Sequence, residues 1–106
     1  MIVVTSSRIA GYKIVKTLGL VRGNTIRARA IGRDILAALK NLVGGEIEEY
    51  TKLMAESREQ AIDRMKAEAR QMGANAIIDI RFSTSEVMQA AAEMLVYGTA
   101  VVIEPE

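Results

Sequence analysis

The sequence predicts one α+β domain over residues 1–106, in which an antiparallel sheet is packed by one short and one long helix in two layers. Apolar and β-branched residues gather near both ends of the chain, and each end is divided at hairpin-range spacing. Two segments between them repeat apolar residues at helical spacing. The expected order is therefore strand–strand–helix–helix–strand–strand, which favours an antiparallel sheet under helices.

The composition excludes several classes of function. The chain has 14 Lys and Arg against 13 Asp and Glu, a net charge of +1, whereas nucleic-acid-binding domains usually carry a strong basic excess. Three Tyr and one Phe, with no Trp, are too few for a platform that stacks bases. The absence of Cys and His removes disulfides, thiolate or imidazole zinc sites and triads with a histidine base.

No apolar run approaches the roughly 18 residues that a membrane helix needs. The first residues also lack the basic and apolar regions of a signal peptide. We therefore expect a cytoplasmic protein that does not insert into membranes.

The first third of the chain reads as strand. Residues 2–4 form a short apolar run, and residues 12–28 are rich in β-branched side chains. Gly19 and Gly23 interrupt the second run, and glycine within a strand marks a bulge or bend. Gly23 and Asn24 also suit a two-residue turn, so either one long bent strand or a hairpin fits this segment.

Two helices are expected next. Residues 33–43 place five aliphatic side chains on one face, and Gly44 and Gly45 end that helix. Residues 46–72 form a longer stripe of period 3.6, followed by Gly73 as the residue after the helix. Arg58 interrupts the stripe, so the helix is either continuous or bent near Ser57. The stripe residues are Ile47, Tyr50, Met54, Ala61, Met65, Ala69 and Met72.

The last third returns to strand. Residues 76–82 alternate apolar and polar from Ile78 onward, which indicates a strand with one buried face. Residues 83–89 are more polar and suit a loop or a ragged continuation. Residues 94–104 form the last strand; its end is apolar on both faces, and Pro105 ends it.

Metal and catalytic motifs are weak. Six Met residues are better explained by packing than by ligation of a soft metal, because such sites usually add Cys or His. Asp34, Asp79 and Glu86 are the weak candidates for a hard cation, but no recognised carboxylate loop is present. Gly44 and Gly45 follow a helix and precede Glu46, unlike a phosphate-binding loop.

A local cluster of positive charge is formed by Arg22, Arg27, Arg29 and Arg33. It suits an anion or an acidic partner, but a solvated surface explains it better.

Together, several blocks of sequence resemble the central signature and flanking segments of the YbjQ family. The match covers about residues 2–103, and the order of its blocks is more specific than any block alone. The blocks are Arg33-Asp34-Ile35-Leu36, Leu42-Val43-Gly44-Gly45, Tyr50, Gly73-Ala74-Asn75-Ala76-Ile77-Ile78, Gly98-Thr99-Ala100-Val101 and an N-terminal series from Gly11 through Gly19 to Gly23.

The resemblance implies a dodecin-like α+β subunit that assembles into a ring-shaped homopentamer. It would explain a helix long for its domain and an apolar last strand, because an oligomer buries surplus apolar surface. Resemblance alone selects the residues expected to bind a ligand, namely Arg33, Asp34, Gly44, Gly45 and Tyr50.

The chain departs from the family pattern in three places. Glu46 stands where Arg is common, Asn75 replaces Asp, and Asp79 replaces Gly. The family is labelled as heavy-metal-binding, which suits a chain without Cys and His poorly.

The leading hypothesis is a non-enzymatic, self-assembling protein that holds a ligand or partner at subunit boundaries. A carboxylate metal-binding protein is the alternative. An enzyme ranks last, because no nucleophile and base are paired in the sequence, and no particular cofactor is implied.

Overall fold

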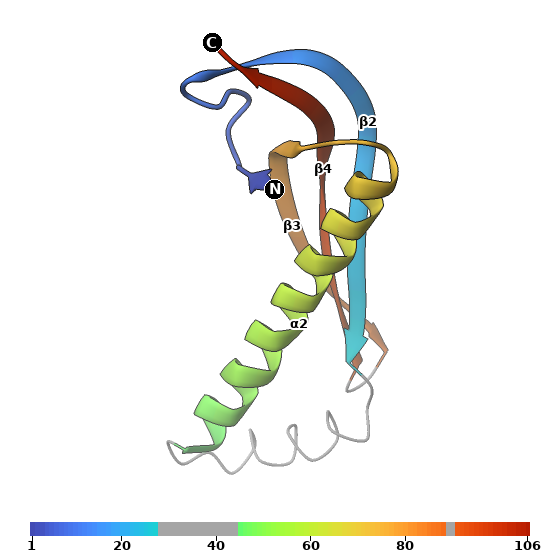
Figure 1. Ribbon diagram of the computed structural model, residues 1–106. Helices are drawn as coiled ribbons and strands as arrows, with labels where there is room; N and C mark the ends of the chain where they lie inside the picture. Colours follow the sequence, from blue (N-terminus) through green and yellow to red (C-terminus); the bar gives the residue numbers. More distant parts are fainter. Residues whose placement is uncertain (28–44, 89–90) are drawn as a thin grey trace.

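The computed structural model describes residues 1–27, 45–88 and 91–106, and Figure 1 shows a long helix lying across one face of a four-stranded sheet. The strands are β1 (Ile2–Val3), β2 (Tyr12–Arg27), β3 (Ala76–Met88) and β4 (Ala91–Pro105), and the helix is α2 (Gly45–Gln71). The sheet order is β1-β3-β4-β2. The predicted α+β class is confirmed.

The sheet is mixed, so the expectation of a wholly antiparallel sheet is wrong. β4 pairs antiparallel with both β2 and β3, but β1 runs parallel to β3. The reason lies in the connection after β1, which carries the chain to β2 at the opposite edge of the sheet instead of turning back in a hairpin.

The long helix is confirmed as one continuous element from Gly45 to Gln71. Gly73, with a φ of 89°, follows it as predicted. The amide of Gly73 donates to the carbonyl of Arg70, and the amide of Ala74 donates to the carbonyl of Ala69. These two bonds form a Schellman motif, which satisfies carbonyls at the helix end.

The described residues contain this one helix, so the expected pair of helices is not borne out by them. The short helix predicted over residues 33–43 lies outside the described residues. Arg29, which belongs to the predicted basic cluster, lies there too.

Residues 12–27 form one bent strand, and the hairpin alternative is wrong. The pairing of β2 with β4 shifts between Ile14 and Lys16 and again between Thr17 and Gly19, which marks irregularities of the bulge type. From Leu20 onward the register is unbroken through Gly23 and Asn24, so these two residues are paired strand positions and not a turn.

β3 and β4 are both longer than their predicted cores. β3 continues through residues 83–88, so of the two alternatives for this segment the strand continuation is confirmed and the loop is wrong. β4 starts at Ala91. The end of β4 is buried as predicted, with Val101 and Ile103 on one face of the sheet and Ala100 on the other.

Two apolar clusters lie on opposite faces of the sheet. The cluster beneath α2 contains Val21, Ala61, Met65, Ala69, Ile77, Ile80, Val96 and Ala100. The other contains Ala76, Ile78, Val101 and Ile103, and is covered by Ile2, Val4 and Ile9. The N-terminal segment therefore covers the apolar cluster on one face of the sheet, and α2 covers the cluster on the other.

The helix meets the sheet through small residues. Ser57 and Ala61 are fully or almost fully buried one turn apart, and Met65 and Ala69 continue the same line. Ser57 explains why the apolar stripe seemed interrupted, because it faces the sheet and its carbonyl accepts a hydrogen bond from the hydroxyl of Thr25 at 3.2 Å. Met72, expected on the stripe, is largely exposed instead.

Gly23 is the point of closest approach between α2 and β2. A Cβ atom at this position would lie 2.0 Å from the carbonyl oxygen of Ala61 and 2.5 Å from the amide nitrogen of Met65. These neighbours are helix backbone, which cannot rotate away as a side chain does. Only glycine therefore permits the observed packing distance.

Replacing this glycine tests the contact. We expect Gly23→Ala to lower the free energy of unfolding by at least about 2 kcal/mol, because α2 must move away from the sheet. Urea denaturation measures the loss. Gly11→Ala is the control, since Gly11 has a positive φ but no atom near its would-be Cβ. An equal or smaller loss for Gly23→Ala would contradict the argument.

Candidate functional site

The segment between β1 and β2 builds the most distinctive polar structure of the described residues. After β1, Val4 still pairs with β3, because its amide donates to the carbonyl of Ile77 and its carbonyl accepts from the amide of Ile80. The chain then follows β3 as far as Ser6, whose carbonyl accepts from the amide of Asp79 at 3.0 Å. This segment therefore extends the short β1 along the edge of the sheet.

Asp79 lies where β3 bulges between Ile78 and Arg81. Its φ of 54° is the one positive value among the described non-glycine residues. Asp tolerates this conformation better than most side chains. Its Oδ1 accepts a hydrogen bond from the Ser7 hydroxyl at 2.7 Å. The Asp79 side chain therefore fixes the segment between β1 and β2 against β3.

Arg81 secures the same corner from the other side. Its Nη1 donates to the carbonyl of Thr5 at 3.1 Å and to the carbonyl of Ile80 at 2.9 Å. The Ser6 hydroxyl donates to the carbonyl of Arg8 and shapes the following turn. Thus two charged side chains of β3 fix the segment Thr5-Ser6-Ser7.

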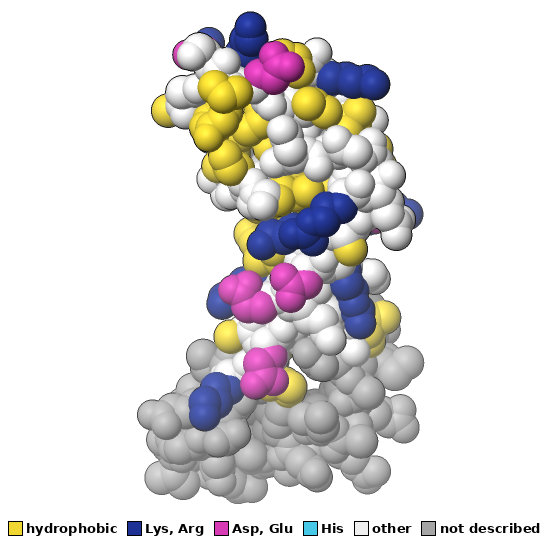
Figure 2. Space-filling model, viewed as in Figure 1, with side chains coloured by type: hydrophobic (Ala, Val, Ile, Leu, Met, Phe, Trp, Pro, Cys, Tyr) yellow, Lys and Arg dark blue, Asp and Glu magenta, His cyan; other side chains and the backbone are white. Residues whose placement is uncertain are grey.

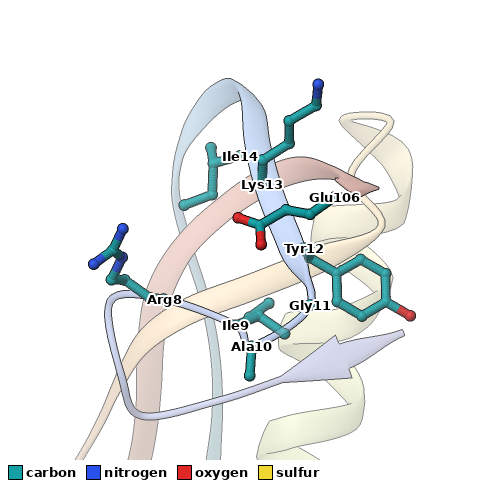
Figure 3. A pocket seen from close by; sticks show the side chains of 8 residues that line it. All are labelled: Arg8, Ile9, Ala10, Gly11, Tyr12, Lys13, Ile14 and Glu106. Atoms are coloured by element: carbon teal, nitrogen blue, oxygen red, sulfur yellow. The ribbon is translucent and has the colours of Figure 1, made fainter.

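A pocket of about 650 Å³ lies beyond this turn, at the end of the sheet where the C-terminus is found. The amide of Tyr12 donates to the carbonyl of Ile9, and the amide of Glu106 donates to the carbonyl of Gly11. These bonds bring the chain end against the start of β2. Residues 8–14 and Glu106 line the pocket (Figure 3).

The charged side chains among the lining residues are Arg8, Lys13 and Glu106. Figure 3 shows the Glu106 carboxylate extending across the lining residues, whereas the Lys13 amine points away from them. Arg8 lies at the opposite side from Tyr12. This arrangement offers charged hydrogen-bonding groups to a small polar ligand, and it does not pair a nucleophile with a base.

Of the predicted ligand residues, the structure describes two, Gly45 and Tyr50. Arg33, Asp34 and Gly44 lie outside the described residues. Gly45 begins α2 and Tyr50 follows in its second turn, at the end of the helix far from the pocket (Figure 1). Sequence reasoning did not find the pocket residues, because they come from the two ends of the chain and form no motif.

Two of the three carboxylates proposed for a metal, Asp79 and Glu86, belong to the described strand β3. Asp34 lies outside the described residues, Glu86 belongs to β3, and Asp79 lies seven positions before Glu86 on the same strand. Among residues 1–27, 45–88 and 91–106, no three His, Cys, Asp or Glu side chains are grouped so that they could hold a metal ion. The side chain of Asp79 instead accepts a hydrogen bond from the Ser7 hydroxyl.

Asn75 has a role that sequence reasoning noticed only as a departure from the family pattern. Its Nδ2 donates to the carbonyl of Ile103 at 2.9 Å, and its Oδ1 accepts from the amide of Ile103 at 2.8 Å. The side chain thus pairs with β4 as a strand residue would. An Asp at this position supplies the acceptor but, when ionised, not the donor.

Comparison with known proteins identifies the family of this chain. The profile of the family described as "Putative heavy-metal-binding" (YbjQ) matches residues 1–104. The chain belongs to the YbjQ family. A UPF0145 protein of Dehalococcoides mccartyi strain 195 is 62% identical over 104 residues, 98% of this chain and all of that protein. A UPF0145 protein of Pyrococcus abyssi is 53% identical over 106 residues, which cover this whole chain and 93% of the relative.

A solved structure shares the fold. It is a Pediococcus pentosaceus protein described as belonging to the DUF74 family with unknown function. Its TM-score is 0.67 at 19% sequence identity, and the match covers 98% of both chains. For this YbjQ-family member, α2 of the described residues is not apolar enough to span a membrane, although its length would suffice.

Asp79 gives a test of structural role against ligation. We expect Asp79→Ala to lower the free energy of unfolding by about 1–2 kcal/mol, because it loses the Ser7 hydrogen bond and suits a positive φ less well. Asp79→Asn is the matched control, since its Oδ1 still accepts from Ser7. Urea denaturation should show Asn close to wild type, and equal losses for both variants would contradict the structural role.

Proposed function

We propose that this YbjQ-family protein is a non-enzymatic, cytoplasmic protein that assembles into a ring-shaped homopentamer and holds a small ligand or partner at its subunit boundaries. The observation that carries the proposal is surplus surface. One chain exposes 6840 Å², about 1,000 Å² more than the scaling expected for a folded monomer of this size. A standard protein interface buries about 800 Å² per partner.

The shape of the subunit supports association. Its radius of gyration is 17.0 Å, against about 13 Å for a compact domain of this length. Its principal extents are 54 × 23 × 16 Å, so it is more than twice as long as it is wide. Several large apolar side chains of the described residues are exposed in this extended subunit, among them Ile14, Leu20 and Phe82.

Exposed apolar side chains are found on the strands. Leu20 is 63% exposed and Ile26 is 56% exposed, and both lie on the face of β2 away from α2. Tyr97 of β4, which pairs with Arg22, is on the same face and is 38% exposed. The solvent face of an antiparallel sheet is normally polar, so these side chains favour a covered face.

The front of α2 is different. Figure 2 shows Lys, Arg, Asp and Glu side chains of both signs distributed along it. The exposed residues of α2 include Arg58, Glu59, Asp63 and Arg64. A mixed charged surface of this kind is typical of a face that remains in water, which directs association to the strands.

Native mass spectrometry of protein purified without a metal-affinity step tests the proposal. We expect a five-subunit mass, the number that the family resemblance implies, because a closed ring satisfies the head-to-tail surface of every copy. A monomer at micromolar concentration would overturn the proposal. A five-subunit mass without an adduct supports assembly alone, whereas a retained organic mass identifies the ligand class.

The same measurement separates the alternative carried by the family description. Stoichiometric retained metal that is lost in Asp79→Asn would support carboxylate ligation and contradict the structural role given to Asp79. Any bound metal must also raise the melting temperature, because ligands that bind only the native state stabilise it. No shift with divalent ions is the result expected here.

A further inference from the structure

The pocket at the end of the sheet is built on backbone that hydrogen bonds hold in place. The amide of Tyr12 donates to the carbonyl of Ile9 at 3.1 Å, which closes a turn, and Gly11 has the φ of 80° that the third position of a type II turn requires. The amide of Glu106 donates to the carbonyl of Gly11 at 3.0 Å. Both chain segments around the pocket are therefore fixed relative to each other.

Two opposite charges at this pocket have no partner in the described part of the protein. Arg8 and Glu106 both line the pocket, and both are exposed. Among residues 1–27, 45–88 and 91–106, neither the guanidinium of Arg8 nor the carboxylate of Glu106 makes a hydrogen bond or an ion pair. The charged side chains of the neighbouring corner, Asp79 and Arg81, are by contrast used by the fold. The charges of Arg8 and Glu106 are therefore available to a ligand.

The third charged side chain, Lys13, is placed differently. Successive residues of a strand point to opposite faces, so Lys13 lies on the other face of β2 from Tyr12 and Ile14. Figure 3 agrees, because the Lys13 amine points away from the other lining residues, whereas the Glu106 carboxylate lies between Arg8 and Tyr12. The charges that serve the pocket are therefore one cation and one anion.

The remaining lining is largely apolar. Ile9, Ala10, Tyr12 and Ile14 contribute it, and the side chain of Ile14 is 40% exposed. A ligand that covers these side chains removes apolar surface from water, which favours binding. The volume of about 650 Å³ lies within the range of about 300–1,000 Å³ that small-molecule sites occupy.

We propose that this pocket binds a small zwitterion with an apolar side chain, the chemistry of an α-amino acid, with the ligand carboxylate on Arg8 and the ligand ammonium on Glu106. A simple anion attracted by Arg8 is repelled by Glu106, and a simple cation meets the opposite problem. A molecule that carries both charges satisfies both groups. The inference rests on the ligand-binding part of the proposed function, and it does not depend on assembly because one chain lines the pocket.

Each part of such a ligand has a matching group. The guanidinium of Arg8 can donate two parallel hydrogen bonds to a carboxylate, and the carboxylate of Glu106 accepts from an ammonium group. The side chain of the ligand then lies against Ile9 and Ile14. Loss of either charge on the ligand should therefore weaken binding, and so should loss of the apolar side chain.

Amide chemical-shift titration of the isotope-labelled protein tests the site with four probes. L-leucine carries both charges and an apolar side chain, isoamylamine lacks the carboxylate, isocaproate lacks the ammonium, and glycine lacks the side chain. We expect leucine to give saturable shifts centred on residues 8–14 and Glu106. Isoamylamine and isocaproate should each bind at least about tenfold more weakly, because each loses a charge-assisted hydrogen bond.

Two pairs of variants separate the site from general attraction between charges. Arg8→Gln should weaken leucine binding about tenfold, whereas Lys13→Gln, which removes the cation that points away, should leave it unchanged. Glu106→Gln should also weaken it, whereas Glu104→Gln should not, since Glu104 is exposed and does not line the pocket. In Arg8→Gln, leucine and isoamylamine should bind about equally, because the partner of the ligand carboxylate is gone.

Three results would overturn this inference. The first is the absence of saturable shifts with leucine and with phenylalanine into the millimolar range. The second is a set of shifts centred elsewhere in the protein, and the third is an equal loss of binding in Arg8→Gln and Lys13→Gln. A five-subunit mass without leucine binding overturns the site and leaves self-assembly standing, whereas a monomer that binds leucine overturns self-assembly and leaves the site standing.

Discussion

The contact between Gly23 and the backbone of α2 is the constraint on which the rest of the subunit depends. Helix and strand can approach this closely only because Gly23 has no Cβ and because Ser57 and Ala61 are small. That approach places Met65 and Ala69 directly on Val21, Ile77 and Val96, which builds the larger apolar cluster. The irregular pairing earlier in β2 then bends the strand without disturbing this contact.

The other face of the sheet is closed by a different device. There is no second described helix to cover Val101 and Ile103, so Ile2, Val4 and Ile9 do so. That solution requires the N-terminal segment to be fixed, and Asp79 and Arg81 fix it with hydrogen bonds to Ser7 and to the carbonyl of Thr5. Asp79, a weak candidate for a metal in the sequence, thus has a structural role in the fold.

These two coverings leave a particular part of the sheet without one. α2 diverges from the strands toward its N-terminus, and the N-terminal segment reaches β3 only as far as Ile80 (Figure 1). The exposed Ile26 lies beyond the N-terminal segment, because Glu93 of β4 places it level with Ser85. Assembly of copies is the physical remedy that suits an extended subunit, because the apolar surface it leaves open is costly in water.

The sequence by itself determined the α+β class, the long helix with its Gly73 end and the buried last strand, because these follow from local periodicity and capping. It did not determine the sheet order, the choice between hairpin and single strand at Gly23, or the parallel pairing of β1. Those depend on which distant segments meet: α2 occupies the space at Gly23, and β1 finds its edge beside β3. For the same reason, no sequence pattern predicted the pocket residues, because they come from both ends of the chain. The tertiary structure alone decided them, because burial and hydrogen-bond satisfaction are properties of the assembled layers and not of any one segment.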